Sequence, residues 1–115
     1  MGLDLLRELG DGEFHLLRGD IQQRLQKWDK ALRDYATAEE MLPNNQEPLL
    51  RRAETLENMG DSEKALEAYA RAIKLAPDNP VPYLLRAFLY DRKGDRARAD
   101  SDRRFALRLR KRCGA

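Results

Sequence analysis

The chain of 115 residues has one cysteine, one histidine and few aromatic residues, which make up 7% of it. A single cysteine, Cys113, excludes a framework of internal disulfide bonds and fits a reducing compartment. No apolar run approaches the ~18 residues that indicate a membrane span, and the N-terminus lacks the pattern of a secretory signal. We therefore expect a cytoplasmic protein without a membrane span.

Motifs for catalysis and cofactor binding are also missing from the sequence. The histidine, His15, has no nucleophile arranged around it, and no residue pairs with Cys113 to form a catalytic site. There is no glycine-rich phosphate loop, no zinc-ligand spacing and no calcium loop. The sequence predicts a protein that is not an enzyme and that uses no cofactor or metal.

Charged residues, in contrast, are abundant at 37% and unevenly distributed. Residues 1–79 carry a net charge of −5 and residues 80–115 carry +7, although the whole chain carries only +2. This split predicts two differently charged surfaces rather than a uniformly basic protein.

The dominant feature of the sequence is a repeat of 34 residues. Residues 46–79 match residues 12–45 at 11 of 34 positions and match residues 80–113 at nine, whereas chance would give roughly two. A fixed period of this length indicates an array of helical units. We therefore predict three tandem repeats, preceded by residues 1–11, where the amphipathic segment 3–9 is either a stub of a capping helix or a frayed end.

Each repeat is predicted to be a pair of helices joined by a short turn. We expect helices near residues 13–25, 28–42, 47–59, 62–75 and 97–112, with the first helix of the third repeat between the last two. Gly60 and Gly94 suit the turn inside a repeat, where Gln26 makes the first copy less well specified. Short connections of this kind make neighbouring helices pack antiparallel. The predicted helix-starting caps are Asn45, Asn79, Asp61 and Asp95.

Small and aromatic residues recur at fixed places in the repeats. A small residue at position 8 (Gly19, Ala53, Ala87) lets the partner helix approach closely, and the second helix answers with Tyr35 and Tyr69. These residues, with Ala65, Ala72 and Pro77, resemble the tetratricopeptide repeat; the third copy departs from it by having Arg103 at the aromatic position and Lys111 at the proline position. The resemblance implies an all-α, right-handed α-solenoid of three 34-residue helix-turn-helix repeats, with a concave groove for peptides or partner proteins.

The resemblance also implies which residues line that groove, since the first helices face it. Phe88 is the strongest candidate anchor, because an exposed aromatic residue often dominates a binding surface. Most neighbours are acids, so we expect a partner segment with apolar and basic character. Leu16 and Asp20 stand where relatives that clamp a terminal carboxylate have Lys and Asn, so chaperone tails are not expected. The predicted groove residues are Leu16, Asp20, Gln23, Leu50, Glu54, Glu57, Leu84, Phe88 and Asp91.

Two further basic features allow both a functional and a structural interpretation. Arg18, Arg52 and Arg86 recur every 34 residues, and we favour ion pairs with the second helices over an anion-binding ladder. The segment 103–112 has six basic residues in ten and is interpreted as a polar end cap. The alternative is an anionic-surface or nucleic-acid site at Arg103, Arg104, Arg108, Arg110, Lys111 and Arg112.

Three classes of function therefore compete at this point. The favoured one is a non-enzymatic protein-interaction module or scaffold that binds a partner segment in the groove. The second is binding of anions or nucleic acid through 103–112. The third is a self-assembling scaffold, because the array ends at 3–9 and 97–112 have weak caps.

Overall fold

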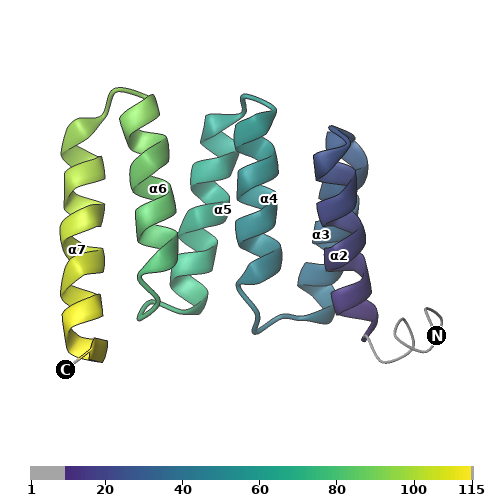
Figure 1. Ribbon diagram of the computed structural model, residues 1–115, viewed down its shortest axis with the longest axis horizontal. Helices are drawn as coiled ribbons and strands as arrows, with labels where there is room; N and C mark the ends of the chain where they lie inside the picture. Colours follow the sequence, from purple (N-terminus) through teal and green to yellow (C-terminus); the bar gives the residue numbers. More distant parts are fainter. Residues whose placement is uncertain (1–9, 115) are drawn as a thin grey trace.

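The computed structural model describes residues 10–114, and these residues form α-helices and no strand (Figure 1). The predicted all-α class is confirmed, and the helix ends lie within about two residues of those expected. The predicted stub at 3–9 lies outside the described residues. The helices are α2 (Asp11–Arg24), α3 (Trp28–Met41), α4 (Glu47–Asn58), α5 (Ser62–Leu75), α6 (Val81–Arg92) and α7 (Arg96–Gly114).

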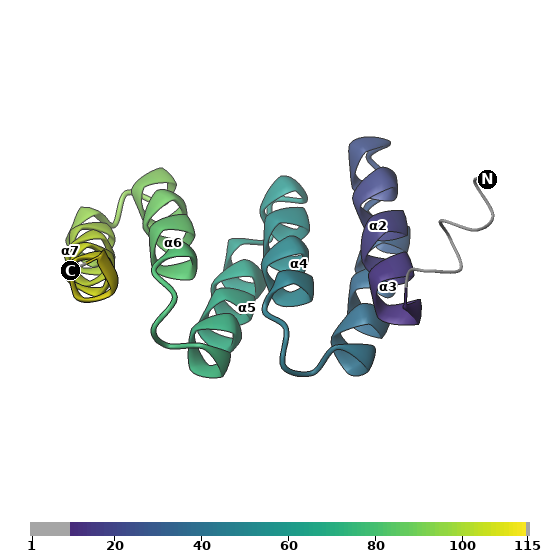
Figure 2. The same cartoon turned by 60° about the horizontal axis from the view of Figure 1, so that its bottom comes forward.

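Consecutive helices pair into three hairpins, α2/α3, α4/α5 and α6/α7, which stand side by side in a row (Figure 1). The first helices of the hairpins lie toward one side of the row and the second helices toward the other (Figure 2). The closest packing is between the two helices of each hairpin, followed by α3 with α4 and α5 with α6. This arrangement is consistent with three repeats, each of which packs only against its neighbours.

The turn inside each hairpin has the same backbone geometry in all three copies. Gly60 and Gly94 have φ angles of 85° and 84°, and Gln26 has a φ of 60°. In each copy the residue directly after the one with positive φ donates its amide hydrogen bond to a carbonyl near the end of the first helix. The pairs are Lys27 to Gln22, Asp61 to Leu56 and Asp95 to Tyr90. Gln26 thus takes the left-handed conformation that glycine takes in the other two turns, at a cost to the first hairpin.

Small residues allow the two helices of a hairpin to approach closely, as predicted. Ala53 and Ala87 are buried, and so is Gly19. A β-carbon on Gly19 would lie 2.6 Å from Cε1 of Tyr35, which is fully buried. Since real side chains do not approach so closely, the first hairpin needs glycine where the others hold alanine.

The helix starts follow the prediction in the second helices and differ from it by one residue in the first helices. Asp61 and Asp95 accept hydrogen bonds from the amides of Lys64 and Arg98, as N-cap side chains do. Asn45 and Asn79 were predicted to be N-caps, but the caps are Gln46 and Pro80. The prediction was off by one residue because both asparagines bond the first helical amide from outside the cap, at Glu47 and Val81.

Gln46, the N-cap of α4, makes a contact within the second repeat that the repeat pattern did not indicate. Its side-chain amide donates to the carbonyl of Ala72 at 2.7 Å, near the end of α5. Its side-chain oxygen accepts a hydrogen bond from Asn79. The Ala72 carbonyl also accepts a hydrogen bond from the amide of Ala76, so Gln46 gives it a second donor near the end of α5. Among the described residues, no helix is both long and apolar enough to cross a membrane.

The Gln26 turn generates a stability prediction. Gln26→Gly removes the cost of a left-handed backbone at a residue with a side chain, so we expect the free energy of unfolding to rise by about 1 kcal/mol. Chemical denaturation monitored by circular dichroism measures this change. The matched control is Gly60→Gln, which should lower stability by a similar amount; nothing lies within 4 Å of its added β-carbon, so the backbone angle alone acts. Equal stability of Gln26→Gly and wild type would contradict this account.

Candidate functional site

A cavity of about 300 Å³ lies between α4 and α6, with the second helix α5 behind it. We call it the α4–α6 cavity. It brings together four of the nine predicted groove residues, Leu50, Glu54, Glu57 and Phe88, although they come from two different repeats. The cavity is lined by Leu50, Arg51, Glu54, Glu57, Tyr69, Leu85 and Phe88.

The apolar residues of this cavity differ in how much they offer to a partner. Phe88 is 65% exposed, and Leu84, one turn earlier on α6, is 41% exposed. Leu50, predicted to be a contact of the same kind, is only 8% exposed because it packs into the core cluster of the second hairpin. Leu50 thus forms part of the cavity floor and Phe88 its open apolar edge, while Leu84 stands one turn from Phe88 outside the lining.

Two predicted groove acids are engaged by buried tyrosines of their own hairpins. Tyr35 donates its hydroxyl hydrogen bond to Asp20, and Tyr69 donates to Glu57. Burial, together with these carboxylate acceptors, raises the pKa of both tyrosines well above the usual value, so both hydroxyls remain protonated donors. The sequence did not indicate these tyrosine partners, because the pattern of apolar positions does not show where a tyrosine hydroxyl ends.

Other predicted groove residues also contact protein groups. Gln23 accepts a hydrogen bond from the buried hydroxyl of Thr55, which joins α2 to α4. Glu57 lies 3.3 Å from Nη1 of Arg92. Glu54, in contrast, is exposed and has no ion-pair or hydrogen-bond partner among the described residues. Glu54 is therefore the acid of this cavity that is most available to an incoming cation. Leu16 is half-buried on α2 and does not line the cavity.

Arg103 occupies the repeat position held by Tyr35 and Tyr69. Like those tyrosines, it donates a hydrogen bond to an acid on the first helix of its own hairpin. Its guanidinium lies 2.5 Å from Asp91 of α6 and 2.5 Å from Asp100 one turn earlier on α7. These two acids raise the pKa of Arg103. Two internal acids thus offset the charge of Arg103, which makes it the least available of the six residues of the alternative anion-binding site, and Asp91 of the predicted groove is bound in the same contact.

The remaining basic residues of α7 are exposed at the end of the row. Ser101, Arg104, Leu107 and Arg108 surround a shallow hollow, and the Arg108 guanidinium lies 5.5 Å from the centre of the Phe105 ring. Among the described residues, no ion-pair partner is found for five of these basic residues, so anion binding by them stays a prediction. The five are Arg104, Arg108, Arg110, Lys111 and Arg112.

The arginines that recur every 34 residues form internal ion pairs, as favoured from sequence. Arg18 binds Asp34 through two hydrogen bonds of 2.9 and 2.7 Å, and Arg86 binds Asp102 through two of 2.8 Å. Asp34 also lies 3.0 Å from Nδ1 of His15. Arg18 lowers the pKa of Asp34, because its hydrogen bonds stabilise the carboxylate.

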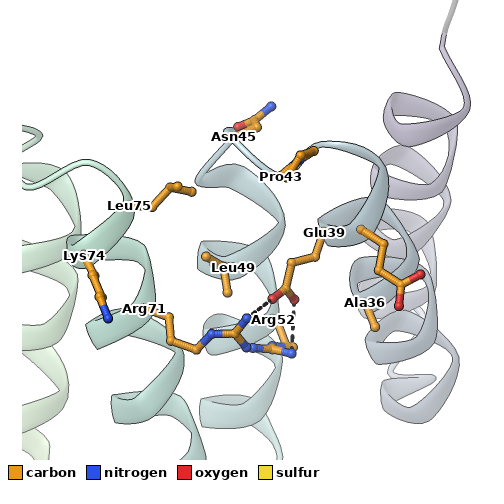
Figure 3. Close-up of a pocket in the computed structure, with 10 residues that line it drawn as sticks. Ala36, Glu39, Pro43, Asn45, Leu49, Arg52, Arg71, Lys74 and Leu75 are labelled. Atoms are coloured by element: carbon orange, nitrogen blue, oxygen red, sulfur yellow. Dashed lines mark ion pairs between the residues drawn. The ribbon is translucent and has the colours of Figure 1, made fainter.

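Arg52 follows a different pattern, which creates a second cleft that sequence reasoning missed. The second repeat has Ala68 where the other two repeats have aspartate. Arg52 instead reaches Glu39 of the preceding hairpin at 3.1 Å. Glu39 also binds Arg71 at 2.7 Å, so one carboxylate joins α3, α4 and α5 (Figure 3). We call this contact the Glu39 bridge. The spacing along the chain could not indicate it, because its three members lie in different helices.

The Glu39 bridge lies in a cleft of about 720 Å³ between α3 and α5. Figure 3 shows Leu49 and Leu75 on its wall and Lys74 beside Arg71. Glu39 neutralises two of the three cations there, and Glu40 adds another acid. The cleft therefore carries a net charge of only +1, and its Glu39 bridge joins two hairpins.

The Arg18–Asp34 pair generates a pH prediction. Asp34→Asn should lower the free energy of unfolding by about 1–3 kcal/mol at pH 7, because the hydrogen-bonded charge is lost from a buried position. The pKa of Asp34 is lowered on folding, so its contribution is present above the unfolded pKa of about 3.9 and is lost as the pH falls below it. The difference between variant and wild type should therefore shrink toward pH 3 in denaturation experiments. A difference that is constant from pH 7 to 3 would argue against the ionic contribution; exposed Asp29→Asn is the control.

The Glu39 bridge generates a second stability prediction. Glu39→Gln leaves Arg52, whose side chain is 23% exposed, without its anion. We expect a loss of about 1–2 kcal/mol, less than for a fully buried pair because Arg71 is half-exposed. Denaturant unfolding measures the loss, and Glu40→Gln, an exposed neighbour in the same cleft, is the control. If both variants lose the same stability, the bridge makes no special contribution.

The sequence predicts neither a metal site nor a catalytic site. Among the described residues, no group of three or more His, Cys, Asp or Glu side chains could hold a metal ion. The contacts above are hydrogen bonds and ion pairs within and between hairpins.

Comparison with known proteins finds relatives by fold and by one repeat. Residues 47–79 match the family model of the tetratricopeptide repeat. Two solved structures of MamA superpose with TM-scores of 0.81 and 0.76, at 20% and 22% identity, over 90% and 89% of this chain. The tetratricopeptide-repeat domain of P58(IPK) superposes with a TM-score of 0.75 at 28% identity over 87% of this chain.

These relatives are longer than the present chain, and no curated protein sequence matches it. The alignments span 61% and 59% of the two MamA chains and 28% of the P58(IPK) chain. The matched repeat coincides with the second hairpin, and the superposed structures extend the likeness to all three. Residues 47–79 are a tetratricopeptide repeat, and the chain has the fold of tetratricopeptide-repeat solenoids.

Proposed function

We propose that this chain is a non-enzymatic protein-interaction module that holds a partner segment with apolar and basic side chains over the α4–α6 cavity. The observation that carries the proposal is Phe88, which is 65% exposed at the edge of a cavity of about 300 Å³. A large aromatic side chain so exposed on a helix contributes little to folding. It is suited to contact a partner instead.

The geometry around Phe88 supports one apolar anchor point on the partner. Leu84 lies one turn away on the same helix, and Leu50 and Leu85 line the cavity below Phe88. An aliphatic or aromatic side chain that enters the cavity would contact apolar groups from both α4 and α6. The partner would therefore contact two neighbouring repeats at once, as in other helical grooves that bind peptides.

The charges around the cavity favour basic residues beside that anchor. Glu54 is exposed and lacks a partner among the described residues, and Glu57 lines the same cavity. Arg51 is also present, but it lies 3.4 Å from Glu47 and 3.9 Å from Asp20, which offset its charge. The excess of acids would attract a cationic flank and repel a terminal carboxylate. The carboxyl tails of chaperones are thus not the proposed partners, and the proposed location is the cytoplasm.

A basic peptide provides the test of this proposal. Peptides selected from a displayed random library on the wild-type protein should be enriched in an apolar residue flanked by Lys or Arg. Phe88→Ala should weaken binding of a selected peptide about tenfold or more, measured by isothermal titration calorimetry, because a central aromatic anchor is lost. The melting temperature of the Phe88→Ala variant should stay close to that of wild type, since Phe88 is mostly exposed.

The matched control is Leu107→Ala, because Leu107 is 51% exposed on α7 and lies outside the cavity. It should leave the affinity unchanged. Glu54→Gln should weaken binding about threefold to tenfold and reduce its salt dependence, since one attractive charge is removed. Unchanged affinity in Phe88→Ala, with a stable fold, would refute the proposed site.

A further inference from the structure

The outward face of α2 carries a stripe of exposed apolar side chains at the first end of the row. Leu17, Ile21 and Leu25 are 47%, 53% and 60% exposed. Their spacing of four residues places them along one side of the helix, over about 12 Å at 1.5 Å per residue. We call these three residues the α2 stripe. Exposed apolar side chains that line up in this way indicate a contact surface rather than scattered surface residues.

The repeat register shows what kind of element such a face receives. Ile21 corresponds to Thr55 in α4 and to Leu89 in α6, which are 0% and 2% exposed. Those residues are buried because the second helix of the preceding hairpin packs against α4 and α6. The α2 stripe is the same face in the first hairpin, and it is open. Its geometry therefore fits a helix that packs along α2.

The opposite end of the row offers a mixed surface, in which Leu107, the equivalent of Ile73, is 51% exposed but lies on the same helix as charged residues. Leu32 of α3 packs against the core of the following hairpin. The corresponding residue of α7 is Asp100, which is exposed and bound to Arg103. Arg104 stands near it on α7, where α3 and α5 have alanine. A stack in which α7 of one copy covers α2 of the next would place these charges against leucine and isoleucine, at a large desolvation cost.

We propose that two copies of this chain associate through their α2 helices, which pack antiparallel with stripe against stripe. Each stripe is then covered by an equally apolar surface, and the contact closes with two-fold symmetry. The antiparallel direction also places the positive N-terminal end of each helix beside the negative C-terminal end of the other.

Charged side chains at the border of the stripe favour the same direction. Glu13 in the first turn and Arg24 in the last turn of α2 lie on the same side of the stripe, by their helical spacing. Neither has an ion-pair partner among residues 10–114. In an antiparallel pair whose two-fold axis passes between residues 18 and 19, Glu13 of one copy lies level with Arg24 of the other, symmetry makes this contact twice, and Leu17 and Ile21 of both copies surround the axis. A parallel pair would leave Glu13 and Arg24 about 16 Å apart along the helix axis.

The size of the contact predicts a weak dimer. A helix of 14 residues is about 21 Å long, so one helix-on-helix contact buries less than the roughly 800 Å² per partner that is usual for stable complexes. The two copies should therefore exchange rapidly and associate appreciably only at high protein concentration. The surface is separate from the α4–α6 cavity, so this inference does not depend on the proposed function.

Sedimentation equilibrium of the full chain over a wide concentration range tests the association. The average mass should rise from 13.3 kDa toward twice that value as the concentration increases. Ile21→Lys should raise the dissociation constant about tenfold or more, because it places two cations at an apolar contact. Leu107→Lys makes the same change at a residue of similar exposure on α7, and it should alter the constant by less than about twofold.

Charge reversal tests the antiparallel direction. Glu13→Arg alone and Arg24→Glu alone should each weaken the dimer, since each puts like charges together, and the double variant should restore it. Circular dichroism checks that every variant keeps the helical fold. A wild-type chain that stays monomeric at all concentrations would overturn the proposal, as would equal effects of Ile21→Lys and Leu107→Lys. A double variant weaker than both single variants would overturn the antiparallel arrangement.

Discussion

The close approach of two helices within each hairpin is the contact on which the rest of the structure depends. It requires a side chain no larger than alanine where the helices cross, and Gly19, Ala53 and Ala87 provide it. The first hairpin is the tightest, because the ring of Tyr35 fills the space that a β-carbon on Gly19 would occupy. A larger residue at any of these places would separate the helices and expose the tyrosine or alanine side chains packed between them.

This close packing also determines the electrostatics of the binding face. The tyrosine rings are buried between the helices, but their hydroxyls emerge at the side where α2 and α4 carry acids. Asp20 and Glu57 accept those hydroxyl hydrogen bonds and are held in place by them. In the third hairpin Arg103 supplies the donor, to Asp91, and brings a positive charge with it. The replacement of the core tyrosine by Arg103 thus adds positive charge to this face in the third hairpin. The α4–α6 cavity, in contrast, combines apolar side chains with acids.

Contacts between hairpins follow no single rule along the row. The Glu39 bridge and the Thr55–Gln23 hydrogen bond join the second hairpin to the first by polar contacts, whereas Leu89 of the third hairpin is covered mainly by packing. The two ends then differ. The outer side of α7 is charged and suits solvent, while α2 presents leucine and isoleucine. This asymmetry explains why the two ends of a repeat array need not have the same role: one end can stop the array and the other can receive a further helix.

The sequence by itself determined the helices, their pairing and the register of the repeats. Local spacing decides these features: apolar periodicity places the helices, glycine permits the left-handed turn, and short loops leave antiparallel packing as the available arrangement. It also identified Phe88 as an exposed side chain and the internal pairing of Arg18 and Arg86, because each follows from position within one hairpin.

Only the tertiary structure decided which side chains from different helices meet. It buried Leu50, gave Asp20 and Glu57 tyrosine partners, and occupied Arg103 with two acids. It also brought Glu39 to two arginines and left the α2 stripe open. Such contacts depend on the distance and rotation between neighbouring helices, which are set by packing over the whole array. A repeat pattern specifies the face on which a residue lies, but it does not specify what that residue touches.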